Sequence, residues 1–248
     1  MTSLPMVFLH GWGLHGGVWA ETANGLAGRA VLTPDLAGYG ESAMCAPYQA
    51  DALANRLAET MPDACIVVGW SMGGLVAQAW AARRPEQVRG LVLVGGTPAF
   101  VARPDWPYGL SADLLAGFAE ALLADRHATL LRFLALQARG GETARAVIGR
   151  LRERLFERPE PGLETLRAGL DLLRETDLRA LAATIRCPTL VVHGGHDTLC
   201  PLTAGHWLAE HLPDAELAVH PHAAHAPFLS HPDWFMDRLM TFSARIGQ

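Results

Sequence analysis

Lysine is absent from this sequence: all 20 basic residues among its 248 are arginine. With 25 acidic residues the formal net charge is −5, which gives no support for nucleic-acid binding. No apolar run approaches the roughly 18 residues that cross a membrane, and residues 1–5 lack the basic region and apolar run of an export signal. We therefore expect a cytoplasmic protein without a nucleic-acid or membrane partner.

Cysteine is also scarce. The four cysteines, Cys45, Cys65, Cys187 and Cys200, are scattered without Cys-x-x-Cys spacing. Thiols in a cytosolic chain stay reduced, so neither a disulfide framework nor a zinc site is expected.

Short apolar runs alternate with helical patterns along most of the chain. Several runs, such as 66–68, 91–94 and 190–192, are continuously apolar, which is typical of strands buried on both faces of a parallel sheet. Strands are predicted at 6–10, 30–34, 65–69, 90–95, 189–194 and 216–220, and helices near 50–61, 73–84, 202–212 and 232–245. This alternation predicts an α/β fold, a mostly parallel sheet of about six strands covered by helices.

The alternation breaks between about 100 and 184. Amphipathic helices are predicted there instead, near 111–124, 126–138, 142–157 and 162–174, with proline-rich loops at 102–107 and 158–161. About eighty residues are far more than a crossover connection needs, although a pair of ordinary crossover helices is the alternative. We predict a helical cap over 101–184, inserted into a core formed by 1–100 and 185–248.

The sharpest local signal is Gly69-Trp70-Ser71-Met72-Gly73, which follows a predicted buried strand and opens a helix. It matches the Gly-x-Ser-x-Gly elbow, in which a strained turn lifts the serine hydroxyl above the sheet edge. Glycines are needed on both sides because side chains there would crowd the turn. The helix N-terminus favours developing negative charge, so Ser71 is the predicted nucleophile rather than a simple helix cap.

A serine hydroxyl needs a base, and the base needs an acid that fixes its tautomer. His225 follows the last predicted strand, in a loop that can reach back over the sheet edge; His220 and His222 are its rivals. Asp197, at the carboxyl end of the preceding strand, is the predicted acid, and Asp35 is a weaker candidate. The order serine, aspartate, histidine is that of the α/β-hydrolase triad.

The oxyanion of an acyl-transfer step needs two N–H donors. We expect them at Met72, directly after the nucleophile, and at Trp12, in the glycine-flanked loop after the first strand. The Trp12 side chain is also expected at the mouth of the site. The histidine pairs 193/196 and 220/222 lack both an HExxH helix and cysteine partners, so we expect no metal and no cofactor.

The whole chain resembles the α/β-hydrolase superfamily in segments 7–12, 35–42, 69–74 and 196–197 and at His225. Within the helical region, segments 97–107, 114–118, 132–137 and 141–145 resemble the pimeloyl-[acyl-carrier protein] methyl ester carboxylesterases of biotin synthesis. That family opens with an additional short strand or hairpin, whereas this chain begins almost at its first predicted strand.

The resemblance implies hydrolysis of the methyl ester of pimeloyl-acyl-carrier protein to the free acid and methanol, through an acyl-enzyme on Ser71. It implies a substrate site made of Trp12, Ser71, Met72, Phe133, Leu134, Ala135, Leu136, Gln137 and His225. A short-chain carboxylesterase or thioesterase that takes small esters without a dedicated carrier is the alternative. Cofactor-free haloperoxidases and C–C bond hydrolases share the triad, whereas a catalytically dead binding protein is disfavoured because the triad is complete.

Arginine is concentrated between residues 126 and 158, a segment that contains eight arginines and only three glutamates. The plain interpretation is a solvated helix surface. In the resembled family, however, cap arginines dock the acidic acyl-carrier protein, which implies this role for Arg132 and Arg145. We extend the prediction to Arg150, Arg152 and Arg154, and we expect a monomer.

Overall fold

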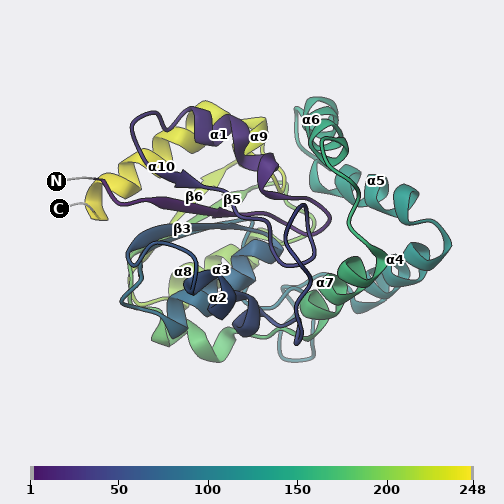
Figure 1. Ribbon diagram of the computed structural model, residues 1–248, viewed down its shortest axis with the longest axis horizontal. Coiled ribbons are helices and arrows are strands. Elements are labelled where there is room, and N and C mark those ends of the chain that lie inside the picture. Colours follow the sequence, from purple (N-terminus) through teal and green to yellow (C-terminus); the bar gives the residue numbers. More distant parts are fainter. Residues whose placement is uncertain (1–2, 247–248) are drawn as a thin grey trace.

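A single six-stranded parallel sheet forms the centre of the computed structural model, which describes residues 3–246 (Figure 1). The strand order is β2-β1-β3-β4-β5-β6, and every pairing is parallel. The strands are β1 (Met6–Leu9), β2 (Val31–Leu32), β3 (Cys65–Trp70), β4 (Val88–Val94), β5 (Thr189–Gly194) and β6 (Ala215–His220). The predicted α/β fold and the expected six strands are therefore confirmed.

Helices cover both faces of the sheet (Figure 1). One face carries α1 (Ala20–Asn24), α9 (Pro227–Ser230) and α10 (Pro232–Ile246), and the other carries α2 (Ala50–Ala58), α3 (Met72–Arg83) and α8 (Leu202–His211). The central strands are buried on both faces because they are continuously apolar. Helix α3 is buried almost all round, as expected for a helix that packs against α2 and three strands.

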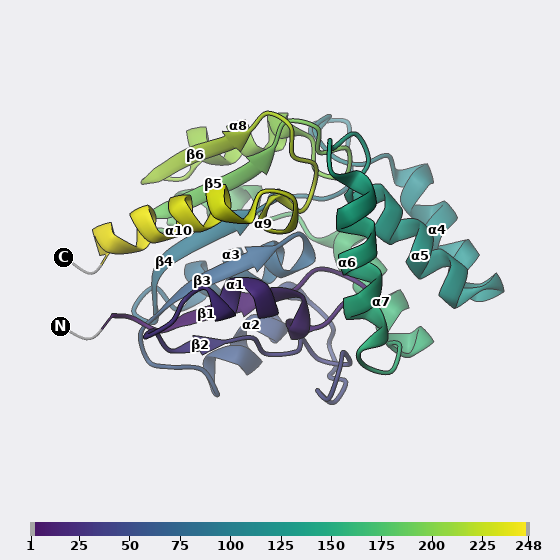
Figure 2. The same cartoon turned by 90° about the horizontal axis from the view of Figure 1, so that it is seen from above.

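Four further helices gather beyond the carboxyl ends of the strands (Figure 2). They are α4 (Ala112–Ala124), α5 (Arg126–Gln137), α6 (Ala144–Phe156) and α7 (Leu163–Glu175), and all four were predicted to within a few residues. Helix α4 packs against α5 and α7, and α5 packs against α6. The chain leaves the core and returns to it at one place, because Ala99 and Asp177 form a β-bridge and the Leu178 N–H donates to the Pro98 carbonyl at 2.8 Å.

The shortest elements depart from the prediction. The turns η1 (Gly16–Trp19) and η2 (Arg179–Thr184), together with α1 and α9, were not predicted, because none is long enough to show a helical period. Strand β2 has only two residues, Val31 and Leu32, and lies at the sheet edge, where it pairs with β1 alone. Within residues 3–246 no helix is long and apolar enough to cross a membrane.

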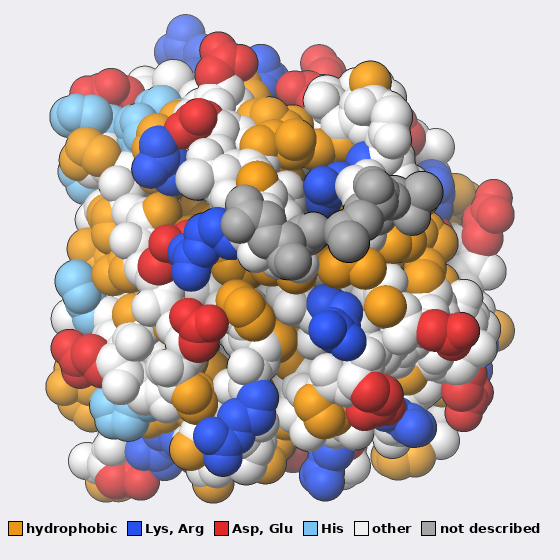
Figure 3. Space-filling model, turned by 90° about the vertical axis from the view of Figure 1, so that its left-hand side faces the viewer, with side chains coloured by type: hydrophobic (Ala, Val, Ile, Leu, Met, Phe, Trp, Pro, Cys, Tyr) orange, Lys and Arg blue, Asp and Glu red, His pale blue; other side chains and the backbone are white. Residues whose placement is uncertain are grey.

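The face that bears both chain ends lies opposite the four gathered helices. Acidic and basic side chains are interspersed over this face (Figure 3). It therefore presents no broad field of one sign to a charged partner.

Candidate active site

Ser71 occupies a strained turn between β3 and α3. Its backbone has φ 56° and ψ −119°, and it is the one non-glycine residue within 3–246 that has a positive φ. A Cβ at Gly69 would lie 2.5 Å from the Gly73 carbonyl oxygen, and a Cβ at Gly73 would lie 2.6 Å from that of Leu9. Both glycines are thus sterically required, as the sequence indicated, and the Ser71 side chain is held at the edge of the sheet.

Asp197 and His225 form a buried pair. The Nδ1 atom of His225 lies 2.7 Å from Oδ2 of Asp197, and the other carboxylate oxygen accepts the N–H groups of Leu199 and Cys200, each at 2.9 Å. Burial acts to raise the pKa of the Asp197 carboxyl, but the charge and hydrogen bond of His225 outweigh it, and the pKa lies below its ordinary value. The carboxylate therefore holds the proton on Nδ1 and leaves a lone pair on Nε2.

The His225 ring lies near Trp70, which precedes Ser71, with 5.8 Å between the ring centroids. The Ser71 N–H donates to the Val94 carbonyl at 3.1 Å, and a Cβ on the next residue, Gly95, would lie 2.8 Å from Nδ1 of His225. The Trp70 indole N–H also donates to the His225 carbonyl at 2.9 Å. Within residues 3–246 the Nε2 atom of His225 is buried without a partner, which leaves it free to take a proton from a nucleophile.

Two backbone N–H groups close to the nucleophile have no acceptor among the described residues. Within the described part of the chain, neither the Met72 N–H nor the Trp12 N–H makes a hydrogen bond. Met72 is the first residue of α3, where an unpaired N–H is ordinary. The loop that carries Trp12 touches the elbow, because a Cβ at Gly11 would lie 3.4 Å from Cβ of Ser71. Both groups therefore suit the binding of an oxyanion.

The rival residues are engaged elsewhere. Asp35 accepts the N–H of Gly16 at 2.8 Å and pairs with Arg158, so it anchors loops rather than a histidine. The His220 ring stacks on His231 with 3.6 Å between centroids, and His222 lies on the surface, 3.0 Å from Glu142.

Two buried histidines near the site make contacts that the sequence did not indicate. Nε2 of His193 lies 2.7 Å from the Cys200 carbonyl oxygen and 3.6 Å from the Asp197 carboxylate, and burial lowers its pKa. His10 accepts the Leu36 N–H at 3.0 Å, and burial lowers its pKa to about 4. The sequence placed both histidines in strands and rejected His193 as a metal ligand, but it did not indicate their hydrogen bonds.

Helix α5 brings only part of its predicted residues to the site. The rings of Phe133 and Trp12 meet edge to face with 4.7 Å between centroids, and the Gln137 carbonyl accepts the His225 N–H at 3.0 Å. Leu134 is buried in the core and Leu136 is half-buried, whereas Ala135 is exposed. The helical period explains the division, since residues four apart share a face and the residue between them points away.

The predicted docking arginines also divide into two groups. Arg150 and Arg154 lie 3.4 and 3.8 Å from Glu21 of α1, and Arg150 donates to the Leu229 carbonyl at 2.8 Å. These two side chains hold α6 against the core. Arg132, Arg145 and Arg152 are exposed, and no carboxylate in residues 3–246 pairs with them.

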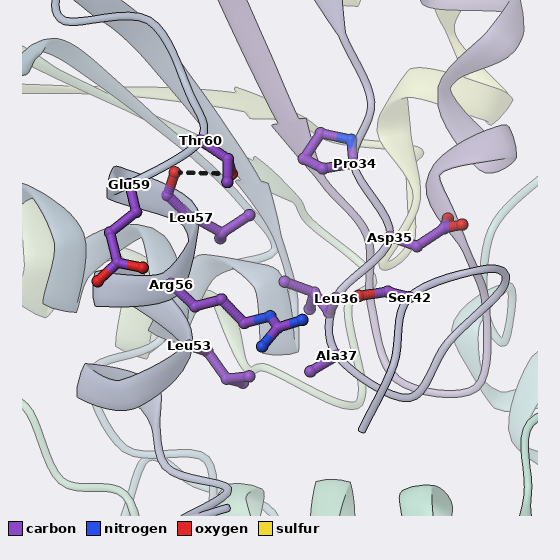
Figure 4. A pocket seen from close by; sticks show the side chains of 10 residues that line it. All are labelled: Pro34, Asp35, Leu36, Ala37, Ser42, Leu53, Arg56, Leu57, Glu59 and Thr60. Carbon is purple, nitrogen blue, oxygen red and sulfur yellow. Dashed lines mark hydrogen bonds between the residues drawn. The ribbon is translucent and has the colours of Figure 1, made fainter. Parts of the chain in front are cut away.

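A cavity of about 460 Å³ lies away from this site, between the loop 34–42 and α2 (Figure 4). The Arg56 side chain points toward Leu36 and Ala37, whereas the Asp35 carboxylate points away (Figure 4). Ser71, Asp197 and His225 are not among its lining residues, so this hollow is separate from the predicted triad.

The fold and the site together define a class of protein. A parallel sheet with a serine elbow after β3, an aspartate after β5 and a histidine after β6 is the arrangement of an α/β hydrolase. The sequence profile described as alpha/beta hydrolase fold matches residues 5–232.

Individual relatives narrow this class. The chain is 46% identical over 235 residues to the pimeloyl-[acyl-carrier protein] methyl ester esterase of Chromobacterium violaceum, which covers 94% of this chain and 92% of that protein. It is 42% identical over 232 residues to the same-named esterase of Nitrosomonas europaea, which covers 93% and 92%. The chain belongs to the alpha/beta hydrolase fold family and, within it, to the family of these esterases.

A solved structure agrees with the fold. The esterase from Exiguobacterium antarcticum superposes with a TM-score of 0.89 at 24% identity, covering 98% of this chain and 92% of that one. At that identity the likeness concerns the fold alone.

Proposed function

We propose that this protein is a serine carboxylesterase that hydrolyses the methyl ester of pimeloyl-acyl-carrier protein to the free acid and methanol, in biotin synthesis. The observation that carries the proposal is the buried Asp197–His225 pair, 2.7 Å apart and next to the Ser71 elbow, in a chain 46% identical to the esterase of that name from Chromobacterium violaceum. The pair supplies the base that an ester-cleaving serine needs.

The chemistry proceeds in two halves. Nε2 of His225 takes the proton of Ser71 as Oγ attacks the ester carbonyl, and the N–H groups of Trp12 and Met72 stabilise the oxyanion. His225 then protonates the departing methoxide, which leaves as methanol, and an acyl-enzyme remains. Water activated by His225 attacks this acyl group, and Ser71 leaves with the proton restored.

The helices over 101–184 act in this proposal as the cap of the substrate site. A pimeloyl chain attached to its carrier at one end must reach Ser71 with the methyl ester at the other. The faces of Trp12, Phe133 and Gln137 enclose that path, since all three side chains are buried at the junction of α5 with the core. Leu134 and Leu136 pack beside Phe133 and Gln137 on α5 and support these two residues. Ala135 is exposed and does not contact the substrate in this proposal.

Carrier docking is assigned to the exposed arginines of the cap. Arg132, Arg145 and Arg152 offer guanidinium groups free of carboxylate partners within residues 3–246, as an acidic carrier requires. Arg150 and Arg154 are already engaged with Glu21, so we assign them to cap attachment instead.

The setting of the reaction belongs to the same proposal. One chain supplies every residue of the site, so a monomer suffices. The four cysteines are free thiols, which suits the reducing cytoplasm. None of the proposed steps uses a cofactor.

The decisive experiment compares substrates. Purified enzyme is given pimeloyl methyl ester on acyl-carrier protein, and separately a free short-chain p-nitrophenyl ester, with Ser71→Ala as the blank. We expect a higher kcat/KM on the carrier-linked ester, with one methanol released per free carboxylate. An equal or lower kcat/KM on the carrier-linked ester would instead identify the general short-chain carboxylesterase.

A further inference from the structure

The indole of Trp12 is held by two helices of the cap. Its N–H donates to the Leu166 carbonyl of α7 at 2.9 Å, and its ring meets Phe133 of α5 edge to face. The side chain is completely buried. The residue that presents the proposed oxyanion N–H on its main chain is therefore fastened to the cap through its side chain.

Gly169 makes this attachment possible. A Cβ at Gly169 would lie 2.6 Å from Cδ1 and 2.9 Å from Nε1 of Trp12, and 2.8 Å from the Tyr39 hydroxyl. Real Cβ atoms do not approach ring atoms so closely, so even alanine would push the indole away. Gly169 lies in the middle of α7, where glycine is unfavourable by about 1 kcal/mol relative to alanine. The glycine therefore disfavours the helix locally but leaves room for the ring.

The neighbouring contacts are equally close. A Cβ at Gly13, one residue beyond Trp12, would lie 2.9 Å from a methyl group of Leu130 in α5. The oxyanion loop thus lies between α5 and α7, so a displaced indole would meet side chains on both sides.

We propose that Gly169 is a positioning residue for the esterase reaction: by admitting the Trp12 indole against α7, it sets the direction of the Trp12 N–H in the oxyanion hole. This inference rests on the proposed function. It gives the cap a part in the chemical step, in addition to enclosing the substrate. Oxyanion donors act only when they point at the developing charge, and removing one costs 10²–10³ in kcat.

The first test is Gly169→Ala, assayed on a small p-nitrophenyl ester that makes no use of the carrier. We expect kcat to fall at least tenfold with little change in KM, because the affected contact strengthens only in the transition state. The matched control is Gly117→Ala in α4, where an added Cβ meets no atom within 4 Å. The control should keep full activity, and both variants should keep the wild-type circular dichroism. A Gly169→Ala enzyme with wild-type kcat would overturn the proposal.

A double-mutant cycle separates positioning from general damage. The readout is the rate at which a p-nitrophenyl phosphonate modifies Ser71, since the adduct places an oxyanion in the hole and one turnover suffices even when kcat is very low. In a Trp12→Ala background, which keeps the main-chain N–H but removes the indole, Gly169→Ala should have no further effect. An equal loss in both backgrounds would mean that the alanine acts through Tyr39 or α7 itself, which refutes the proposal. Failure of the proposed function looks different, because wild type itself would then show no preference for the carrier-linked ester, whatever Gly169→Ala does to the small ester.

Discussion

The N–H of His225 donates to the carbonyl oxygen of Gln137, 3.0 Å away. This hydrogen bond joins the loop of the catalytic base to the last residue of α5, as the indole of Trp12 joins the oxyanion loop to α7. Both loops that would carry the reaction are therefore fastened to the cap helices.

Replacing the triad acid should abolish most of the turnover. Asp197→Asn would stabilise the wrong tautomer of His225, and kcat should fall by about 10⁴ while the fold persists. Asp35→Asn is the control, because Asp35 supports Gly16 and Arg158 and should affect stability more than kcat. Steady-state kinetics and thermal unfolding of both variants check this. A large kcat loss confined to Asp35→Asn would transfer the role of acid to that residue.

Covalent labelling should single out Ser71. Phenylmethylsulfonyl fluoride needs a serine activated by a base, and among residues 3–246 only Ser71 combines the strained elbow with a neighbouring histidine–aspartate pair. Peptide mass spectrometry should therefore find one sulfonyl group per chain at Ser71. Ser230 provides an internal control, since its Oγ lies 2.8 Å from His231 without an acidic third partner. Modification at Ser230 or Ser42 in place of Ser71 would refute the nucleophile assignment.

Reversing the charge of the cap should weaken only the carrier-linked reaction. Arg132→Glu combined with Arg145→Glu should raise KM for the carrier-linked ester at least tenfold, and added salt should lower wild-type activity on it. Hydrolysis of a small ester should be unchanged. Arg83→Glu with Arg238→Glu makes the same change of charge on α3 and α10, and should affect neither substrate. If both pairs raised KM alike, the effect would be one of net charge rather than docking.

Acid should destabilise the protein through His10. Burial lowers its pKa to about 4, whereas the unfolded chain has the ordinary value of 6.5. Between these values the unfolded state binds more protons than the folded state. The contribution of neutral, buried His10 to the free energy of unfolding is therefore complete above about pH 6.5 and is lost as the pH falls toward 4. Between pH 7.5 and 5, wild type should lose about 2 kcal/mol more unfolding free energy than His10→Gln. Urea titrations at both pH values measure this, and parallel losses would show that His10 does not contribute.

Much of this architecture was predictable, because its signals are local. Apolar runs such as 66–68 identify strands, and the elbow needs its glycines within two residues of Ser71. Asp197 and His225 were predicted from their positions after strands, since a parallel sheet brings those ends together. Strand β2, by contrast, was overestimated, since only Val31 and Leu32 of the predicted run 30–34 form the strand.

The remaining features depend on contacts between distant segments. The pairing of Arg150 and Arg154 with Glu21 could not be predicted, because a helix face shows which side chains share a surface but not what that surface meets. The hydrogen bond from Trp12 to Leu166 is even harder to predict from the sequence, since its acceptor is a main-chain carbonyl, which every residue possesses. From the sequence, Gly169 is therefore only a glycine that lowers helix propensity, and nothing indicates that it makes room for Trp12.

The bridge between Ala99 and Asp177 has an evolutionary consequence. A segment that departs and returns at one point can change in length or sequence without stretching the sheet beneath it. We expect that segment 112–175 can change between relatives and bring a new substrate preference to the same triad. A replacement must keep the contacts that this segment makes with the two loops of the site. It must place a residue without a side chain opposite Trp12, unless a smaller residue replaces the tryptophan, and it must offer a main-chain carbonyl to the His225 N–H.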